Sequence, residues 1–290
     1  KRGDALEVTV IDIAPDEYGY TVIAPGFGFL RDVFPAPYIV YWRLTRVGAV
    51  SDGMPRITVP YEAFPGSIGV LPGEPEIKKW KAREADLIGA GGVALGPSPG
   101  GAKPGSICGQ TGTHKDDCLR TIPPRENGGN MDVQQQQIGT KIIFPCFIDG
   151  CGLFAGDIHY AQGDGEVSGT AIEMGSVLTV RVKILPFKGE DMDMPVTVGN
   201  DQIIDMEPTR YYQTLGIPLK AKGEIPPSHT YLDSGKLAGL ENVNEDLTIS
   251  ARHALLQMID YLVKEHGLTK EQAYILCSVA VDLRVGQVVD

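Results

Sequence analysis

Hydrophobic and polar residues alternate along most of the first two thirds of the chain, in short stretches bounded by glycine and proline. Alternation places every second side chain on one face, which is typical of a half-buried β-strand. The later stretches are close neighbours separated by glycine-bearing turns, so we expect antiparallel pairing in a sandwich or barrel. The strands predicted in this way are 5–13, 38–47, 56–61, 141–148, 153–160, 166–173 and 177–184.

A helical pattern appears first over residues 76–87, where Ile77, Trp80 and Leu87 fall on one face. The stretch that follows, 89–129, is polar and rich in glycine and proline. A long irregular segment inside a compact enzyme is usually a loop that forms a site or a lid. An exposed insertion has the same composition, and the sequence leaves both interpretations open.

The last 50 residues change to a helical pattern. Asn244 is predicted to cap a helix whose apolar stripe extends to Leu262 and which ends at Gly267. Thr269 and Gln272 have the spacing of a capping box, so a second helix is expected to begin there. These two helices predict a helical end to a chain that is otherwise built from strands.

The fold class predicted from these patterns is mainly β (α+β), with a β-sandwich or barrel body. A smaller C-terminal α+β part carries the two helices. We expect three consecutive parts: a β-rich part with the glycine-rich loop at 1–132, a sandwich or barrel part at 133–240, and a helical part at 241–290.

Composition agrees with short strands and limits the partners. The chain has 36 glycines and 21 prolines among 290 residues, which favours many turns over long helices. Its formal net charge of −11 argues against binding to nucleic acid or to an anionic membrane, since phosphate groups would repel it. No apolar run is long enough to cross a bilayer.

The five cysteines are an odd number, and their spacing predicts reduced thiols in the cytoplasm. Cys108, His114 and Cys118 form at most part of a zinc site, because no fourth ligand follows in the expected register. The chain starts at Lys1, directly before a strand pattern, so we expect a piece of a longer protein.

The densest group of acids, imidazole and glycine lies at 156–173. Asp157 and His159 are two residues apart, so a regular strand would direct both side chains to one face. Asp164 and Glu166 repeat this spacing after a glycine turn. The flanking residues are apolar, and buried acids beside an imidazole require a cation or a shared proton. The group therefore predicts a metal site or a general acid/base pair.

A second candidate is the string Gly128-Gly-Asn130-Met-Asp132. Its two glycines allow the backbone to approach a ligand, while the amide and the carboxylate supply a donor and an acceptor. A plain turn explains the same residues. The sequence by itself does not choose between these two interpretations.

Two other chemistries remain open for the 156–173 group. Cys146 would act as a nucleophile if His159 were its base, although a packed small residue fits the strand alternation better. A cupin-like barrel presents similar ligands on paired strands and would make the chain a metal-dependent oxygenase or a small-molecule binder. The usual second histidine of that pattern is missing here.

Three motifs together resemble the acetamidase/formamidase family. They are Gly128-Gly-Asn-Met-Asp132, Gly156-Asp-Ile-His159 with Gln162-Gly-Asp-Gly-Glu166, and Gly169-Thr-Ala-Ile-Glu173. The resemblance covers essentially the whole chain, with one departure: an N-terminal segment carrying further polar residues in the family has no counterpart here. Part of the active site is therefore expected to lie outside these residues.

The resemblance implies an amidohydrolase of amidase type, which cleaves the C–N bond of a small linear amide such as formamide or acetamide to a carboxylate and ammonia. It also implies a divalent metal, for which we expect zinc, with calcium as the alternative, and assembly as a homo-oligomer. The residues that match its polar motifs are assigned as follows: Glu166, His159 and Asp164 to catalysis; Gln162 and Asn130 to substrate binding; Asp132, Asp157 and His159 to the metal.

Overall fold

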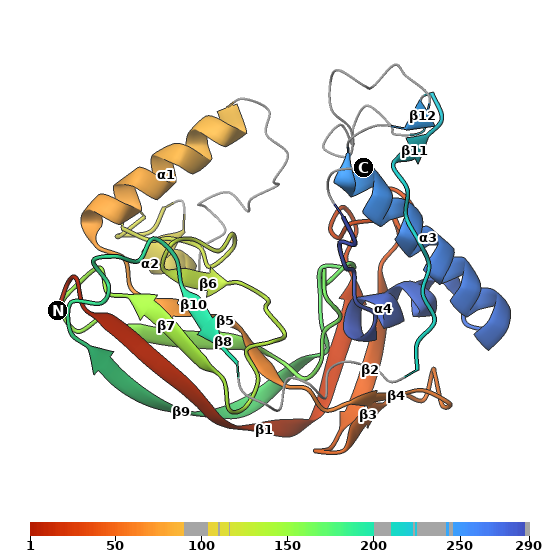
Figure 1. Ribbon diagram of the computed structural model, residues 1–290, viewed down its shortest axis with the longest axis horizontal. Helices are drawn as coiled ribbons and strands as arrows, with labels where there is room; N and C mark the ends of the chain where they lie inside the picture. The colour runs from red at the N-terminus through yellow and green to blue at the C-terminus, as the bar shows by residue number, and fades with distance from the viewer. Residues whose placement is uncertain are drawn as a thin grey trace. The chain divides into compact units, whose positions relative to one another are not determined.

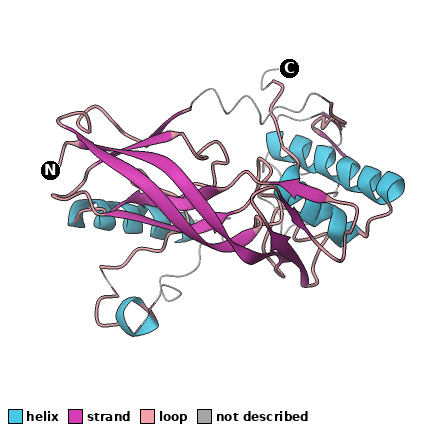
Figure 2. Cartoon of the chain, turned by 90° about the horizontal axis from the view of Figure 1, so that it is seen from below, coloured by secondary structure: helices cyan, strands magenta, loops and turns pink. Residues whose placement is uncertain are grey.

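The computed structural model describes residues 1–89, 104–109, 111–115, 117–199, 210–222, 224, 242–243 and 246–287. Strands are more abundant than helices in this part of the chain (Figure 2), which confirms the mainly β fold class. The chain divides into two compact units that interleave along the sequence. Unit 1 comprises Lys1–Ile13, Phe64–Ile158 and Val177–Ile203, and unit 2 comprises Ala14–Ala63, His159–Ser176 and Ile204–Asp290.

Three strands belong to both units, because each crosses from one to the other. They are β1 (Ala5–Ile23), β8 (Leu153–His159) and β9 (Glu173–Leu185). β9 lies between β1 and β8 in the strand order of the large sheet. The two units therefore interleave, and the division into parts at 1–132, 133–240 and 241–290 stays a prediction.

Strand β1 is much longer than the 5–13 predicted. Its first half pairs antiparallel with β7 (Lys141–Pro145) through Ala5–Thr9, and its second half pairs with β2 (Tyr38–Leu44) through Tyr18–Ile23. Pro15, which has no amide hydrogen, lies between these two stretches. The proline therefore interrupts neither ladder.

Unit 1 also contains β5 (Phe64–Val70), β6 (Gly128–Asn130), β10 (Val196–Val198), and the helices α1 (Glu74–Gly89) and α2 (Gly105–Cys108). β5 is buried along its whole length and pairs with β6, and β10 pairs with β7. Helix α1, orange in Figure 1, covers the expected 76–87 and buries Trp80. The rings of Trp80 and Phe147 pack edge-on, with their centroids 5.7 Å apart. This aromatic contact anchors the helix to the unit.

Unit 2 continues the sheet from β2 through β3 (Gly48–Val50) to β4 (Thr58–Pro60), and it has a small second sheet of β11 (Leu219–Lys220) with β12 (Asn242–Val243). Its two main helices, α3 (Leu247–His266) and α4 (Lys270–Ala280), pack against each other (blue in Figure 1). Both predicted helices are therefore confirmed.

The ends of these helices follow the sequence signals, with one correction. Gly267 ends α3 in the left-handed conformation, and Thr269 with Gln272 forms the predicted capping box. The predicted start at Asn244 is wrong. Asp246 is the N-cap, because its carboxylate accepts the Thr248 amide, and Asn244 itself lies outside the described residues.

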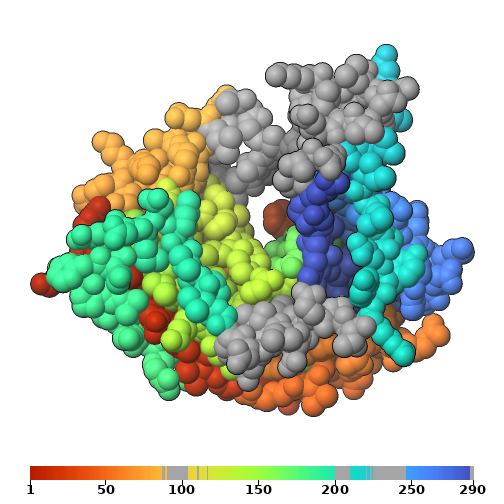
Figure 3. Space-filling view, in the orientation of Figure 1, coloured from red at the N-terminus to blue at the C-terminus, as the bar shows by residue number. Residues whose placement is uncertain are grey.

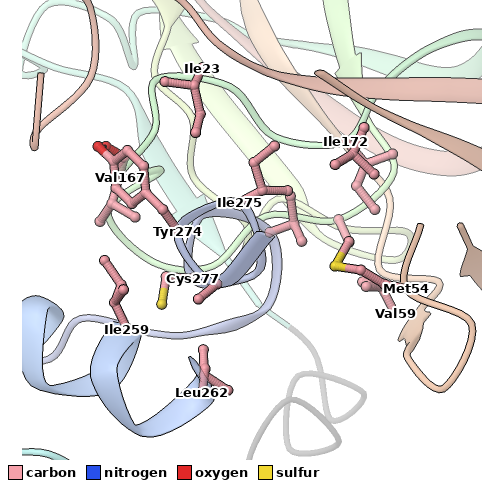
Figure 4. Close-up of a cluster of buried hydrophobic side chains, with 14 of the residues drawn as sticks. Ile23, Met54, Val59, Val167, Ile172, Ile259, Leu262, Tyr274, Ile275 and Cys277 are labelled. Carbon is pink, nitrogen blue, oxygen red and sulfur yellow. The ribbon is translucent and has the colours of Figure 1, made fainter. Parts of the chain in front are cut away.

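The core of unit 2 joins the helical pair to the segment that carries the candidate chemistry. Figure 4 shows Tyr274, Ile275 and Cys277 of α4 packed near Val167 and Ile172. All five side chains are 2% exposed or less. The position of residues 160–172 is therefore set by close packing against a helix more than 100 residues away in the sequence.

One predicted strand is wrong. Residues 166–173 form turns, and only Glu173 enters a strand, as the first residue of β9. Glu166 and Gly169 have positive φ angles of 40° and 85°, and the Gly169 amide closes a turn on the Glu166 carbonyl. A positive φ at a residue other than glycine is incompatible with a regular strand, so the apparent alternation there is misleading.

The prediction of reduced thiols is also wrong for four of the five cysteines. Cys108 is bonded to Cys118, and Cys146 to Cys151. The partial zinc set of Cys108, His114 and Cys118 is thereby excluded, and so is a thiolate nucleophile at Cys146, because its sulfur is already bonded. Cys277 is the free thiol, and burial raises its pKa to about 12.

We expect one thiol per chain to react with a disulfide reagent when the protein is unfolded without reductant. In the folded protein that thiol should be unreactive, because Cys277 is buried and its thiolate is disfavoured. A Cys277→Ser variant should show none. Three or more thiols in the unfolded wild type would contradict the pairing.

Within the described part of the chain, no helix is both long enough and apolar enough to cross a bilayer.

Candidate active site

The imidazole of His159 lies at the centre of a group of polar side chains in unit 2, which also includes Gln162, Glu166 and Glu173. His159 is the last residue of β8, and its side chain is buried, with 1% exposed. Its Nδ1 lies 2.9 Å from Oε1 of Gln162, which is itself buried. An amide oxygen only accepts hydrogen bonds, so Nδ1 carries a proton. Nε2, on the other side of the ring, is the nitrogen that would bind a cation.

Two carboxylates face this nitrogen. Glu173 is the β9 partner of His159, and its Oε2 lies 3.5 Å from Nε2. Its Oε1 accepts the amide of Ala171 at 3.0 Å, which fixes the side chain. Ligand atoms of His159, Glu166 and Glu173 all lie within 4.8 Å of one another. The structure thus brings together the predicted His159 and Glu166, and it adds Glu173.

The segment between β8 and β9 is attached to the C-terminal segment by backbone hydrogen bonds. The Gly163 amide donates to the Ser278 carbonyl at 3.0 Å, and the Leu283 amide donates to the Asp164 carbonyl at 3.0 Å. Gly163 has no room for a side chain: an added Cβ would lie 2.3 Å from the carbonyl oxygen of Val281. The segment that follows α4 (dark blue in Figure 3) therefore supports the site and reaches the surface.

A second set of acids lies beside this segment. The Asp164 amide donates to Oδ1 of Asp282 at 2.9 Å, and the Glu62 amide donates to the Tyr160 carbonyl at 3.2 Å. Burial, with repulsion from Asp282, raises the pKa of Glu62. Burial, with Tyr61 and Glu62 nearby, raises the pKa of Tyr160 well above its usual range. Carboxyls with raised pKa values are candidates for proton transfer.

The raised pKa of Glu62 has a consequence for stability. The folded state binds more protons than the unfolded state between the ordinary value of 4.5 and the folded pKa. The contribution of this group is therefore full below 4.5 and lost as the pH rises through the folded pKa. We expect Glu62→Gln to match the wild type in unfolding free energy at pH 4 and to exceed it at pH 8, as measured by denaturant titration.

Glu126→Gln is the matched control with the opposite sign. Hydrogen bonds from Arg83 lower the pKa of Glu126 to about 2, so its contribution is present above 4.5 and is lost only in strong acid. This variant should be less stable than the wild type at pH 8. If Glu62→Gln also lost stability as the pH rose, the assignment of Glu62 would be wrong.

The other predicted residues form a hydrogen-bonded group in unit 1. The Ser67 hydroxyl lies 2.8 Å from Oδ1 of Asn130 and 3.2 Å from Oδ2 of Asp157, and Nδ2 of Asn130 donates to Oδ2 of Asp132 at 2.6 Å. Carboxylate oxygens of Asp132 and Asp157 lie within 4.8 Å of each other. Both ends of the Asn130 amide are engaged, which favours a supporting role over the predicted contact with substrate.

The short strand β6 depends on its glycines. A Cβ on Gly128 would lie 2.5 Å from the carbonyl oxygen of Ile68, and Gly128 and Gly129 have φ angles of 90° and 100°. This close pairing with β5 sets Asn130 opposite Ser67. The Gly-Gly-Asn string is thus a short strand that positions the side-chain amide of Asn130 beside Ser67. The plain turn, the other interpretation of the sequence, does not describe it.

The predicted metal set of Asp132, Asp157 and His159 contains residues of both units and stays a prediction. Asp157 precedes His159 by two residues in β8 but has a φ of 53°, in the left-handed region. Asp157 is exposed whereas His159 is buried. The regular strand from which a common face was expected is therefore interrupted at the carboxylate.

Comparison with known proteins decides the family. The chain matches the acetamidase/formamidase family over residues 1–290. It belongs to that family. The acetamidases and formamidases are amidohydrolases of small amides, which confirms the class of reaction expected from the motifs.

Similar proteins include an acetamidase of Mycolicibacterium smegmatis, 31% identical over 94% of this chain and 68% of that protein. A formamidase of Methylophilus methylotrophus is 29% identical over 99% of this chain and 70% of that protein. Among solved structures, a gamma lactamase from Delftia acidovorans superposes with a TM-score of 0.81 and 29% identity, covering 100% of this chain and 70% of that one. This family member thus spans about two thirds of the length of its relatives.

Three residues of the site had no strong sequence signal. Glu173 ends the motif Gly169-Thr-Ala-Ile-Glu173, and the strand predicted over 166–173 gives it no distinct role; Ser67 lies in an apolar run. Glu62 stands between two prolines, in a stretch with no pattern of its own. Each acquires its position from a partner distant in sequence, so only the family motif around Glu173 offered a clue.

Proposed function

We propose that this chain hydrolyses a small linear amide, of the formamide or acetamide type, at the group of His159, Glu166 and Glu173. The observation that carries the proposal is the buried imidazole with two carboxylates, their ligand atoms within 4.8 Å of one another. Membership of the acetamidase/formamidase family supports the amide as the substrate class.

These residues fit a divalent cation. Imidazole nitrogen and carboxylate oxygen are both ligand types that zinc accepts, and the Gln162 contact to Nδ1 leaves Nε2 as the ring nitrogen that would bind the ion. Calcium prefers oxygen ligands only, so an imidazole argues for zinc. His159 and Glu173 would hold the ion, and Glu166 would remain for proton transfer. When bound, such an ion polarises an amide oxygen and lowers the pKa of its water.

We assign the proton transfer to Glu166. Its carboxylate takes a proton from the attacking water as the water oxygen bonds to the amide carbon. It then gives that proton to the leaving nitrogen as the C–N bond breaks, which yields a carboxylic acid and ammonia; the acid then ionises to the carboxylate in water. Glu173 is less suited to this task because its Oε1 already accepts the Ala171 amide. We therefore assign Glu173 to holding the imidazole and the ion.

Gln162 acts behind the imidazole in this proposal. It fixes the tautomer of His159 through Nδ1, which is a positioning role. The sequence predicted that Gln162 contacts the substrate amide. Its side chain is only 3% exposed, so we assign it to the imidazole rather than to the substrate. Asp164 is assigned to support, since its backbone joins the site segment to Asp282 and Leu283.

Two further expectations belong to this proposal. Homo-oligomeric assembly is to be tested by light scattering after size-exclusion chromatography. The cytoplasmic location rested on reduced thiols, and the two disulfide bonds weigh against it, because such bonds are more typical of oxidising compartments.

The function is tested by ammonia release from formamide, acetamide and a bulkier amide, before and after removal of metal with a chelator. We expect turnover of at least one small amide, its loss after chelation, and its recovery with zinc. His159→Ala should abolish turnover and lower the bound metal, whereas His266→Ala, at the exposed end of α3, should do neither. Full turnover by His159→Ala would reject the site.

A further inference from the structure

Unit 1 contains a cavity of about 380 Å³ that takes no part in the proposed reaction. It lies beside α1, at the loop that precedes β6. Its size falls within the range of small-molecule sites. Most of its wall is apolar and is made by Leu71, Pro72, Ile77, Leu119, Ile148 and Phe154.

The polar part of the wall carries an excess of positive charge. Arg120 and Arg125 both line the cavity, and both bind the single carboxylate of Glu84. Arg125 makes the closer pair, with Nε and Nη2 at 2.6 and 3.0 Å from the two oxygens. Nη2 of Arg120 lies 3.4 Å from the same carboxylate. Two guanidinium groups thus share one negative charge.

Arg120 has an unused donor. Its side chain is 9% exposed, and its Nη1 is buried without a hydrogen-bond partner. A buried charged donor without an acceptor is costly, so such groups usually have a partner. Burial and the neighbouring Arg125 lower the pKa of Arg120, and Glu84 opposes this effect only in part. An anion in the cavity would offset the positive charge of Arg120.

The remaining acid at the cavity does not supply that anion. Asp117 also lines the wall, but its side chain is 75% exposed and lies 3.3 Å from Nδ1 of His114. Arg83, on α1, donates from Nη1 and Nη2 to the carboxylate of Glu126, and it does not line the cavity. Among the described residues that line the cavity or pair with its arginines, the two positive charges of Arg120 and Arg125 are therefore balanced only by the one carboxylate of Glu84.

We propose that this cavity binds a small organic monocarboxylate with an apolar body, whose carboxylate pairs with the guanidinium of Arg120. The apolar wall contacts the body of the ligand, and the guanidinium fixes its orientation. An inorganic anion would leave the apolar wall unused, and a neutral molecule would leave the charge unpaired. The site is separate in sequence and in residues from the His159 group.

Isothermal titration with benzoate tests the proposal, with benzyl alcohol as the neutral counterpart. We expect one benzoate per chain and at least about tenfold weaker binding of the alcohol, since a hydrogen bond between charged groups contributes about that factor. Arg120→Met should weaken benzoate by a similar factor, whereas Arg83→Met, which removes a guanidinium outside the cavity, should leave binding unchanged.

Two measurements separate this site from others. Nuclear Overhauser contacts between benzoate ring protons and the methyl groups of Ile77, Leu119 or Ile148 are expected in the wild type, so the result does not depend on a variant that folds. Binding should also persist in His159→Ala. Absence of benzoate binding, equal binding of the alcohol, or loss of binding with His159→Ala but not with Arg120→Met would each overturn the proposal.

Discussion

Replacing Glu166 by glutamine should lower kcat for amide hydrolysis by about 10²- to 10⁴-fold, the usual contribution of a general acid–base group. The amide of glutamine keeps the size of the side chain but cannot take the proton from water. The melting temperature and the circular dichroism spectrum should stay close to those of the wild type. Steady-state ammonia release with formamide and acetamide provides the measurement.

Two controls make this result specific. Glu265→Gln changes an exposed carboxylate on α3 and should retain full activity. Glu173→Gln should lower bound metal and kcat together, because Glu173 is assigned to holding the imidazole and the ion. A fully active Glu166→Gln, with an inactive Glu173→Gln that still binds metal, would show that Glu173 is the base and that our assignment is wrong.

Gly163→Ala should lower the free energy of unfolding by about 1–3 kcal/mol, as overpacked substitutions do. The new Cβ would lie 2.3 Å from the oxygen and 2.7 Å from the nitrogen of Val281, and backbone atoms cannot move aside as a flexible side chain can. Relief of this clash requires the site segment and the C-terminal segment to separate. Activity should therefore fall with stability, as followed by denaturant titration and ammonia release.

Gly156→Ala is the matched control. Gly156 lies in β8, its φ is not positive, and nothing lies within 4 Å of the position that its Cβ would take. This variant should change the unfolding free energy by less than about 0.5 kcal/mol. If Gly163→Ala were as stable and as active as Gly156→Ala, the C-terminal segment would not support the site as described.

Much of the secondary structure follows from local patterns. Alternation alone predicted the strands that became β2, β7 and β8, and the apolar stripe predicted both C-terminal helices. The failures also have local causes. At 166–173 the apparent alternation hid turns with positive φ, and at Asn244 a good capping residue stood two positions before the true cap. Propensity identifies candidates for a turn or a cap, and packing selects one of them.

The candidate site, too, was predictable from the sequence only in part. His159, Gln162 and Glu166 fall within eight residues, so their sequence proximity already indicated a common site. The family motifs pointed in the same direction. The role of Gln162 was not predictable, because an amide near an imidazole in sequence can face the substrate or the ring, and only the 2.9 Å contact decides.

Local sequence patterns predict the mainly β class, the helical C-terminal end, and a concentration of acids around one imidazole, since each depends on residues that are neighbours in the chain. Three features become visible only once the chain is folded: Glu173 faces His159, four cysteines are bonded in pairs, and Arg120 is buried beside an apolar cavity. Strand register and burial depend on contacts between distant segments, and no local pattern encodes which distant segment a side chain will meet.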